Sequence, residues 1–153
     1  MLWKDRWKPV VLLVEDDPGD QELTRRALGE RGGEIDLRVV SDGEEALEYL
    51  KHVPGDDEES DCPPPDLILL DLNMPKFDGR EILKYVRRQP NLKLIPIVVL
   101  TTSRNERDVR ECYELGCNTF VSKPDSVEEF MDSIGLIGMY WLRIASTAGL
   151  CPT

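Results

Sequence analysis

The sequence predicts an α/β protein: a doubly wound, five-stranded parallel sheet with strand order 2-1-3-4-5 and helices on both faces. Three short unbroken apolar runs, at residues 10–14, 67–70 and 95–100, are typical of strands buried on both faces of such a sheet. Strand and helix patterns alternate along the chain, and right-handed crossovers then favour the doubly wound arrangement. The two least apolar strands, at 35–39 and 119–121, are the edges in this order, so the pattern agrees with the topology.

Length, charge and cysteine spacing narrow the class of protein. A chain of 153 residues suits one domain with a substantial core. Its formal net charge of −11 disfavours a nucleic-acid surface, which requires a basic face. No apolar run approaches the roughly 20 residues of a membrane span, and the four cysteines form no C-x-x-C pair, as expected of reduced thiols. We therefore expect a cytoplasmic protein that binds neither nucleic acid nor membrane.

Helix signals separate the first strands. Asp17 is well placed to cap the first helix, because a proline follows it at the first helical position. Two glycines at 32–33 end this helix. Residues 35–39 alternate between apolar and charged side chains, the pattern of a partly exposed strand. Asp42 followed by Glu45 resembles a capping box and predicts the start of the second helix.

The second half of the chain repeats the alternation after an acidic, proline-rich segment at 53–65, which predicts a mobile surface loop. Asp78 can cap the next helix, and the helix after that stops at Gly116. The last helix is expected to begin near residues 125–126. The chain then divides into an N-terminal arm, one domain and a C-terminal tail, at residues 1–8, 9–147 and 148–153.

The last helix carries more apolar residues than one packed face needs. One stripe is spaced to face the sheet: Phe130, Ile134, Ile137, Trp141 and Ile144. Six more apolar side chains lie around the rest of the helix: Val127, Met131, Leu136, Met139, Tyr140 and Leu142. We therefore expect a homodimer through this helix and the edge of the fifth strand, with Gly135 and Gly138 allowing close approach of helices. The alternative is that the arm containing Trp3 and Trp7 covers the helix.

Reactive side chains follow four strands that are neighbours in the predicted order. Strand one ends in Glu15 and Asp16, strand three in Asp71, strand four in Thr101 and strand five in Lys123. Ligands of open α/β sheets bind at these carboxyl ends. Converging carboxylates repel one another, and a lysine or a bound Mg²⁺ relieves that repulsion. A solvated loop acid, an ordinary strand threonine or a surface lysine would explain each residue singly, but not their joint occurrence.

Four motifs carry a resemblance to a known family: Val14-Glu15-Asp16, Leu70-Asp71-Leu72-Asn73-Met74-Pro75 with Asp78-Gly79, Leu100-Thr101-Thr102, and Val121-Ser122-Lys123-Pro124. The chain, from about residue 9 to the last helix, resembles the receiver domain of two-component response regulators, a CheY-like, flavodoxin-like fold. The long loop before strand three, Thr-Thr-Ser at 101–103 and the Trp-containing last helix are similar to single-domain regulators paired with bacterial phytochrome kinases.

The resemblance implies how the phosphoryl group is accepted. Asp71 is the implied phosphoacceptor, which attacks a phosphohistidine of a sensor histidine kinase. The implied Mg²⁺ ligands are the carboxylates of Asp16 and Asp71 and the main-chain carbonyl of Asn73, with Glu15 acting through water. Such a reaction depends on alignment and charge neutralisation, which this set of groups supplies.

The resemblance also implies a switch. Lys123 pairs with the acceptor and then with the phosphoryl group, Thr101 bonds a phosphoryl oxygen, and Phe120 moves inward with it. The Lys123–Pro124 peptide is expected to be cis. Two residues depart from the family pattern: Thr102 is larger than the residue often found there, and Asp125 replaces an aromatic.

Three rival functions have specific expectations. An aspartyl phosphohydrolase would place a second acid where this chain has Asn73, and an FMN-binding protein would meet repulsion from the acids at 15–17. A degenerate receiver that serves as a scaffold would not need the complete set of site residues. By the resemblance we expect a stand-alone regulator, a signalling protein rather than an enzyme. Only about one helix follows Lys123, too little for a helix-turn-helix DNA-binding domain. Its output is then another protein or a phosphorelay.

Overall fold

The computed structural model describes residues 8–32, 34–54 and 61–148. The expected arm at 1–8 and tail at 148–153 therefore lie almost entirely outside the described residues, as do residues 55–60 of the predicted 53–65 loop. Among the described residues, no helix is long and apolar enough to cross a membrane.

Five parallel strands form the central sheet: β1 (Val10–Val14), β2 (Asp36–Val40), β3 (Leu67–Leu70), β6 (Ile97–Thr101) and β7 (Thr119–Ser122). Their order is β2-β1-β3-β6-β7, which confirms the predicted order 2-1-3-4-5. The three central strands are buried along their whole length, whereas β7 is only half-buried. The burial follows from position, because an edge strand lacks a neighbour on one side.

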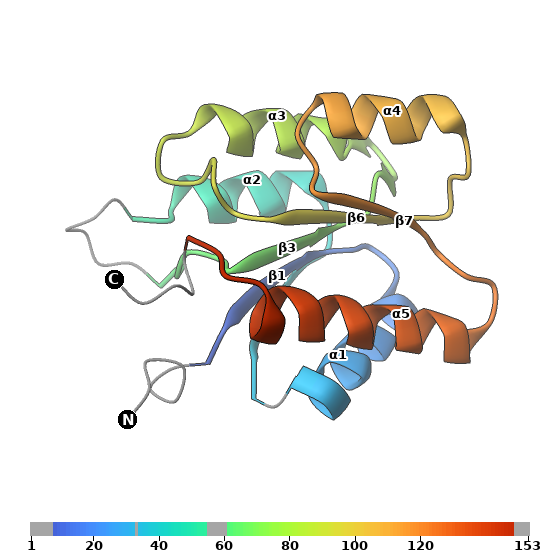
Figure 1. The fold of residues 1–153 in the computed structure, drawn as a ribbon. Coiled ribbons are helices and arrows are strands. Elements are labelled where there is room, and N and C mark those ends of the chain that lie inside the picture. The colour runs from blue at the N-terminus through green and yellow to red at the C-terminus, as the bar shows by residue number, and fades with distance from the viewer. Residues whose placement is uncertain (1–7, 33, 55–60, 149–153) are drawn as a thin grey trace.

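Helices cover both faces of this sheet (Figure 1). They are α1 (Pro18–Gly32), α2 (Gly43–Lys51), α3 (Arg80–Arg88), α4 (Glu106–Glu114) and α5 (Val127–Met139), which continues into the π-helix η2 (Tyr140–Ile144). α1 and α5 pack on one face, and α2, α3 and α4 lie on the other (Figure 1).

The core has two halves because side chains alternate across a strand. Leu12 and Val14 of β1 point into the cluster beneath α2, α3 and α4, and Val11 and Leu13 point toward α1 and α5. All four are buried. The continuous apolar run read from the sequence is therefore a strand packed on both faces.

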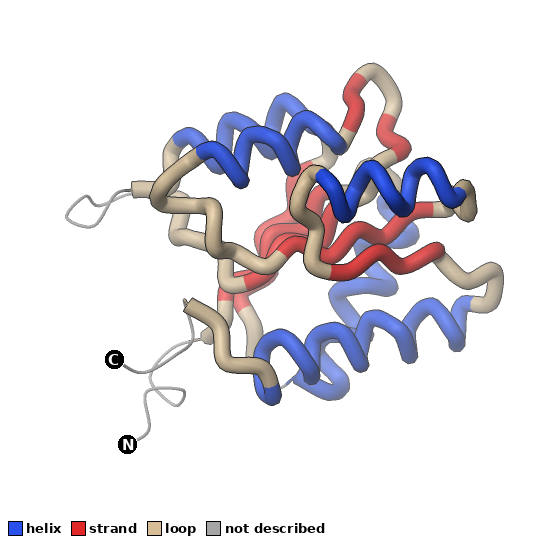
Figure 2. The backbone as a smooth tube through the Cα atoms, turned by 45° about the horizontal axis from the view of Figure 1, so that its top comes forward, coloured by secondary structure: helices blue, strands red, loops and turns tan. Residues whose placement is uncertain are grey.

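A small hairpin that the sequence did not reveal follows β3. The strands β4 (Asn73–Met74) and β5 (Phe77–Asp78) pair antiparallel, so the turn after β3 stands out from the sheet as a separate loop (Figure 2). Lys76 in its tip has a positive φ of 65°. Strands of two residues are too short for a periodicity to reveal them.

The helix starts follow the predicted caps, with one shift. Asp17, Asp42 and Ser126 accept hydrogen bonds from main-chain N–H groups at the starts of α1, α2 and α5. Asp78 lies one residue too early to be the N-cap of α3, which is Gly79. The Asp78 carboxylate still accepts a hydrogen bond from the Arg80 N–H at 3.0 Å.

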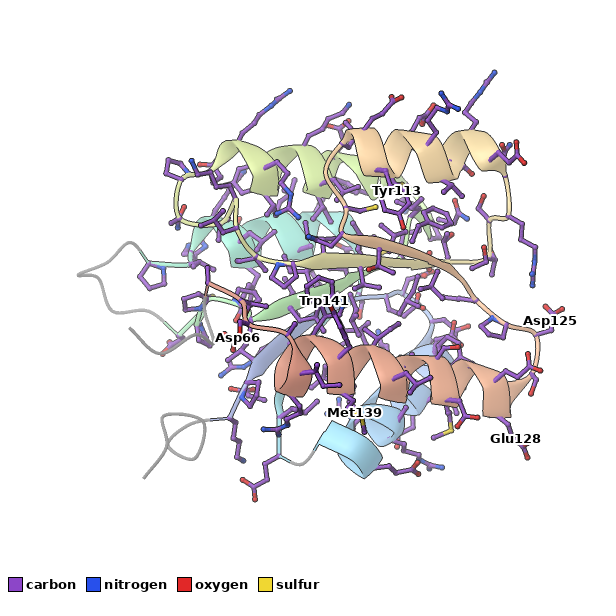
Figure 3. The ribbon with its side chains drawn as sticks, viewed as in Figure 1. Asp66, Tyr113, Asp125, Glu128, Met139 and Trp141 are labelled. Atoms are coloured by element: carbon purple, nitrogen blue, oxygen red, sulfur yellow. The ribbon has the colours of Figure 1, made fainter. Side chains whose placement is uncertain are left out.

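The predicted inner stripe of the last helix is correct only as far as residue 141. Phe130 and Ile134 are buried, and Trp141 points toward the sheet (Figure 3). Ile144 is 65% exposed, whereas Leu142, predicted to lie elsewhere on the circumference, is 2% exposed. The wider π turn causes this change, because it adds a residue to the turn and rotates the side chains after Met139.

The two glycines of the last helix serve the fold. Gly135 and Gly138 are both buried, and a Cβ on Gly138 would lie 2.7 Å from Leu28 Cδ2 of α1. The absence of a side chain therefore lets α5 pack against α1. The expectation that Gly138 allows close approach in a dimer was wrong, because that residue packs against α1 of the same chain.

Candidate functional site

The predicted site residues meet at the carboxyl end of the sheet. Glu15 and Asp16 follow β1, Asp71 follows β3, Thr101 ends β6 and Lys123 follows β7. Ligand oxygens of the three acids lie within 4.8 Å of one another. The strand order produces this convergence, because β1, β3, β6 and β7 are successive neighbours.

Most of the site is removed from solvent. Glu15, Asp71, Thr101 and Lys123 are buried, with at most 9% of each residue exposed, and Asp16 is more exposed. Buried carboxylates are costly unless they are paired. The site therefore holds charge that needs a compensating cation.

Lys123 supplies one such cation. Its ammonium donates hydrogen bonds to Glu15 Oε1 at 2.5 Å, to Asp20 Oδ2 at 2.9 Å and to Asp71 Oδ2 at 3.4 Å. The predicted pairing with Asp71 is present, although it is the longest of the three. Sequence reasoning missed Asp20, which lies in the first turn of α1 and meets Lys123 from a position 103 residues away in the sequence.

The pKa values of Glu15 and Lys123 both lie above their ordinary values, but for different reasons. Desolvation by burial raises the pKa of Glu15 to about 8, although the Lys123 ammonium acts to lower it. Desolvation lowers the pKa of Lys123, but hydrogen bonds to Glu15 and Asp20 and the charge of Asp71 outweigh it, so the pKa lies above its ordinary value. Lys123 is thus held as a cation.

Asn73 connects the acceptor side of the site to Thr101. Its main-chain N–H donates to Asp71 Oδ1 at 3.1 Å, and its side-chain amide donates to Thr101 Oγ1 at 2.8 Å. The resemblance assigned only the main-chain carbonyl of Asn73. The amide link was missed because a sequence does not show which side chains meet across neighbouring strand ends.

Close backbone packing holds the hairpin against the acceptor. A Cβ on Gly79 would lie 2.8 Å from the main-chain oxygen of Asp71. The main-chain N–H of Gly79 also donates to Leu72 O at 3.3 Å. The Asp-Gly pair before α3 therefore has a packing role as well as a motif role.

Other predicted features differ from expectation. The Lys123–Pro124 peptide is trans, since the described residues contain no cis bond. The trans form is the ordinary state of an X–Pro bond, and in it the Lys123 ammonium already reaches three carboxylates. Asp125 points away from the protein, at the turn before α5 (Figure 3), and Ser126 caps a regular helix there.

Phe120, expected to move with Thr101, lies on β7 and is half-buried against the α2–α4 side of the core. Its main-chain N–H donates to the Tyr113 hydroxyl of α4 at 3.2 Å.

Comparisons with a family model and with known proteins point to the same family. Residues 11–135 match the family model described as "Response regulator receiver domain". The chain is 42% identical over 134 residues to the response regulator Rcp1 of Synechocystis sp. (strain ATCC 27184 / PCC 6803 / Kazusa), covering 88% of this chain and 89% of Rcp1.

Solved structures agree. The Mn²⁺-bound form of Rcp1 matches with a TM-score of 0.81 at 40% identity, covering 91% of this chain and 98% of that one. The phosphorylated cyanobacterial phytochrome response regulator RcpA matches with a TM-score of 0.82 at 37% identity, covering 93% and 99%. With four strand-end motifs assembled in one site and relatives matched along most of their length, this chain belongs to the response regulator receiver domain family and resembles its phytochrome-associated members.

Proposed function

We propose that this receiver accepts a phosphoryl group on Asp71 from a phosphohistidine of a sensor histidine kinase. One observation carries the proposal: the Asp71 carboxylate directly follows the central strand β3, lies 3.4 Å from the Lys123 ammonium and has ligand oxygens of Glu15 and Asp16 within 4.8 Å. Signalling through a phosphorylated carboxylate, rather than enzymatic turnover of an external substrate, is the activity of this family that the residues support.

A divalent cation completes the charge balance. The three acids offer only carboxylate oxygens, the ligands that Mg²⁺ prefers. In our assignment Asp16 and Asp71 bind Mg²⁺ directly, together with the main-chain carbonyl of Asn73, and Glu15 acts through water. A divalent cation is held by Rcp1, whose structure was solved with Mn²⁺. When bound, Mg²⁺ would supply the positive charge that draws the phosphoryl oxygens to the site.

The transfer itself needs no proton movement at the acceptor. A carboxylate oxygen of Asp71 bonds to phosphorus as the N–P bond of phosphohistidine breaks, and the imidazole nitrogen keeps the bonding electron pair. Lys123 and Thr101 then bind phosphoryl oxygens. The Thr101 hydroxyl accepts a hydrogen bond from the Asn73 amide, which leaves its own hydrogen free to be donated to a phosphoryl oxygen. We propose that Phe120 follows Thr101 inward.

The most direct test maps the phosphoryl group. The protein is incubated with acetyl phosphate and Mg²⁺, trapped with borohydride and analysed by mass spectrometry. We expect the label on Asp71, none in Asp71→Asn, and wild-type labelling in the matched control Asp132→Asn, an exposed acid on α5. Label in Asp71→Asn, or none in wild type, would overturn the assignment. Sustained release of phosphate would instead indicate a phosphohydrolase.

The donor is proposed to be a kinase of the phytochrome type. The support is the similarity to regulators named for phytochromes, RcpA and the bacteriophytochrome response regulator AtBRR, which is 39% identical. A phosphotransfer profile with phosphorylated phytochrome kinases and unrelated histidine kinases tests this. Equal rates from both classes would contradict it. A cytoplasmic location of the receiver, residues 9–147, is part of this proposal.

We also propose a homodimer through the last helix and the edge of β7. Leu136, Tyr140 and Ile144 lie four residues apart and are 51–65% exposed. Sedimentation equilibrium should show a dimer in wild type and a monomer in Tyr140→Glu. Leu94→Glu, which alters an exposed leucine (69% exposed) in the segment before β6, serves as the control. A wild type that stays monomeric at high micromolar concentration, with and without beryllofluoride, contradicts this contact.

A further inference from the structure

The Lys123 ammonium has three carboxylate partners, but only two of them belong to the proposed metal site. Glu15 and Asp71 offer ligand oxygens to a cation together with Asp16. Asp20 contacts Lys123 at 2.9 Å and is not a member of that group. It is also nearer to the ammonium than Asp71, which lies at 3.4 Å. Asp20 therefore binds the lysine without being committed to the metal.

The position of Asp20 is set by the start of α1. The Asp17 carboxylate accepts hydrogen bonds from the N–H groups of Gly19, at 2.8 Å, and of Asp20 itself, at 3.4 Å. The side-chain amide of Gln21 donates to the main-chain oxygen of Glu15 at 2.6 Å. These contacts fix the first turn against the end of β1, and they leave the Asp20 side chain 28% exposed at the mouth of the site.

Two cations must share this site when the metal is bound. A divalent ion and the Lys123 ammonium both attract Glu15 and Asp71, and they repel each other. If the ammonium had only these two partners, each metal ion that bound would share both carboxylates with it and weaken their attraction for the lysine. A further carboxylate outside the metal group removes this competition, because the ammonium retains a charged partner while Glu15 and Asp71 turn to the metal.

We propose that Asp20 is a positioning residue that holds the Lys123 ammonium on the α1 side of the site, so that lysine and divalent cation occupy the site together. This inference rests on the proposed metal-assisted function. It predicts that loss of the Asp20 carboxylate weakens metal binding in two ways. It removes a negative charge near the cation, and it leaves Lys123 competing for Glu15 and Asp71.

Asp17 provides a matched control for the first of these effects. It lies three residues from Asp20 in the same exposed turn and carries the same charge, but it makes no contact with Lys123. Asn at this position keeps the helix cap, because Asn and Asp are equally good N-cap residues. Asp17→Asn therefore removes a nearby charge and leaves the lysine pairing intact.

The experiment measures Mn²⁺ affinity by electron paramagnetic resonance and Mg²⁺ affinity by competition, without a phosphoryl donor. We expect Asp20→Asn to weaken Mn²⁺ binding about tenfold and Asp17→Asn by no more than about twofold, since an exposed charge is largely screened. Asp20→Glu, which keeps the carboxylate, should restore most of the affinity. Equal losses in Asp20→Asn and Asp17→Asn would overturn the proposal, because the charge alone would then explain them.

A second readout follows the lysine directly. In ¹⁵N-lysine-labelled protein, the Lys123 ammonium signal of metal-free wild type should be slow to exchange and should shift little when Mg²⁺ is added. In Asp20→Asn the same addition should shift it strongly or broaden it, since the ammonium has lost the partner that does not bind metal. Identical spectral changes in both proteins would contradict a positioning role. A failure of acetyl phosphate to label Asp71 would refute the proposed function but would leave these binding results standing.

Discussion

The guanidinium of Arg80, in the first turn of α3, donates a hydrogen bond to the Asp108 carboxylate of α4 at 2.6 Å. It also donates to Glu111 at 2.8 Å and to Asp78 of the hairpin at 3.1 Å. Asp108 in turn accepts a hydrogen bond from the Ser103 hydroxyl, in the loop after Thr101. One side chain thus joins the hairpin, α3 and α4 beside the loop that follows Thr101.

This network should contribute measurably to stability, because the Arg80 side chain is only 20% exposed and makes charge-assisted hydrogen bonds to three acids. We expect Arg80→Gln to lower the free energy of unfolding by about 1–2 kcal/mol. Urea denaturation of wild type and variant measures this difference in the free energy of unfolding. Arg104→Gln is the control, since Arg104 is 63% exposed and lies 3.7 Å from Asp125, and should change stability by less than about 0.5 kcal/mol. Equal effects of the two substitutions would show that the network is not stabilising.

The contact between Gly79 and the backbone of Asp71 gives a second prediction. Gly79→Ala places a Cβ 2.8 Å from a main-chain oxygen that cannot rotate away, so we expect a loss of about 1–3 kcal/mol. Gly29→Ala, at an exposed α1 position with nothing within 4 Å, should instead stabilise by up to about 1 kcal/mol through helix propensity. Chemical denaturation gives the free energy of unfolding of both variants. A Gly79→Ala protein as stable as wild type would mean that the hairpin shifts freely to accommodate the added Cβ.

Metal binding should stabilise the native protein, because a cation relieves the repulsion among Glu15, Asp16 and Asp71. At a Mg²⁺ concentration ten times the dissociation constant, the gain is about 1.4 kcal/mol. Asp16→Asn should remove most of this gain and leave the metal-free protein as stable as wild type or more so. Thermal unfolding with increasing Mg²⁺ tests both statements, and a wild-type melting temperature indifferent to Mg²⁺ would count against the site.

The buried cysteines give a pH prediction. Burial raises the pKa of the Cys112 and Cys117 thiols to about 11, so only about one thiol in a thousand is ionised at pH 8. Since the thiolate is the reactive form, iodoacetamide should modify both very slowly in the native protein, and faster as the pH rises toward 11. Peptide mapping locates the label, with urea-unfolded protein as the control. Native labelling of Cys112 at the unfolded rate would contradict the prediction.

The sequence by itself determined the strand order and five of the residues that meet at the carboxyl end of the sheet. Continuous apolar runs identify β1, β3 and β6 because strands covered on both faces leave no place for polar residues, and the family motifs place Glu15, Asp16, Asp71, Thr101 and Lys123 at strand ends. Helix caps at Asp17 and Asp42 were equally predictable, since capping is a local interaction between a side chain and the next turn.

Tertiary structure alone decided the contacts between residues distant in sequence. The Asp20–Lys123 pair spans 103 residues and the Asn73–Thr101 pair 28, and no local pattern specifies either. The π turn that brings Leu142 inward and turns Ile144 outward breaks the period on which helix prediction depends. Interactions between residues close in sequence determine where each helix or strand begins. The side-chain partners across the site are determined only when packing brings the helices and strands together.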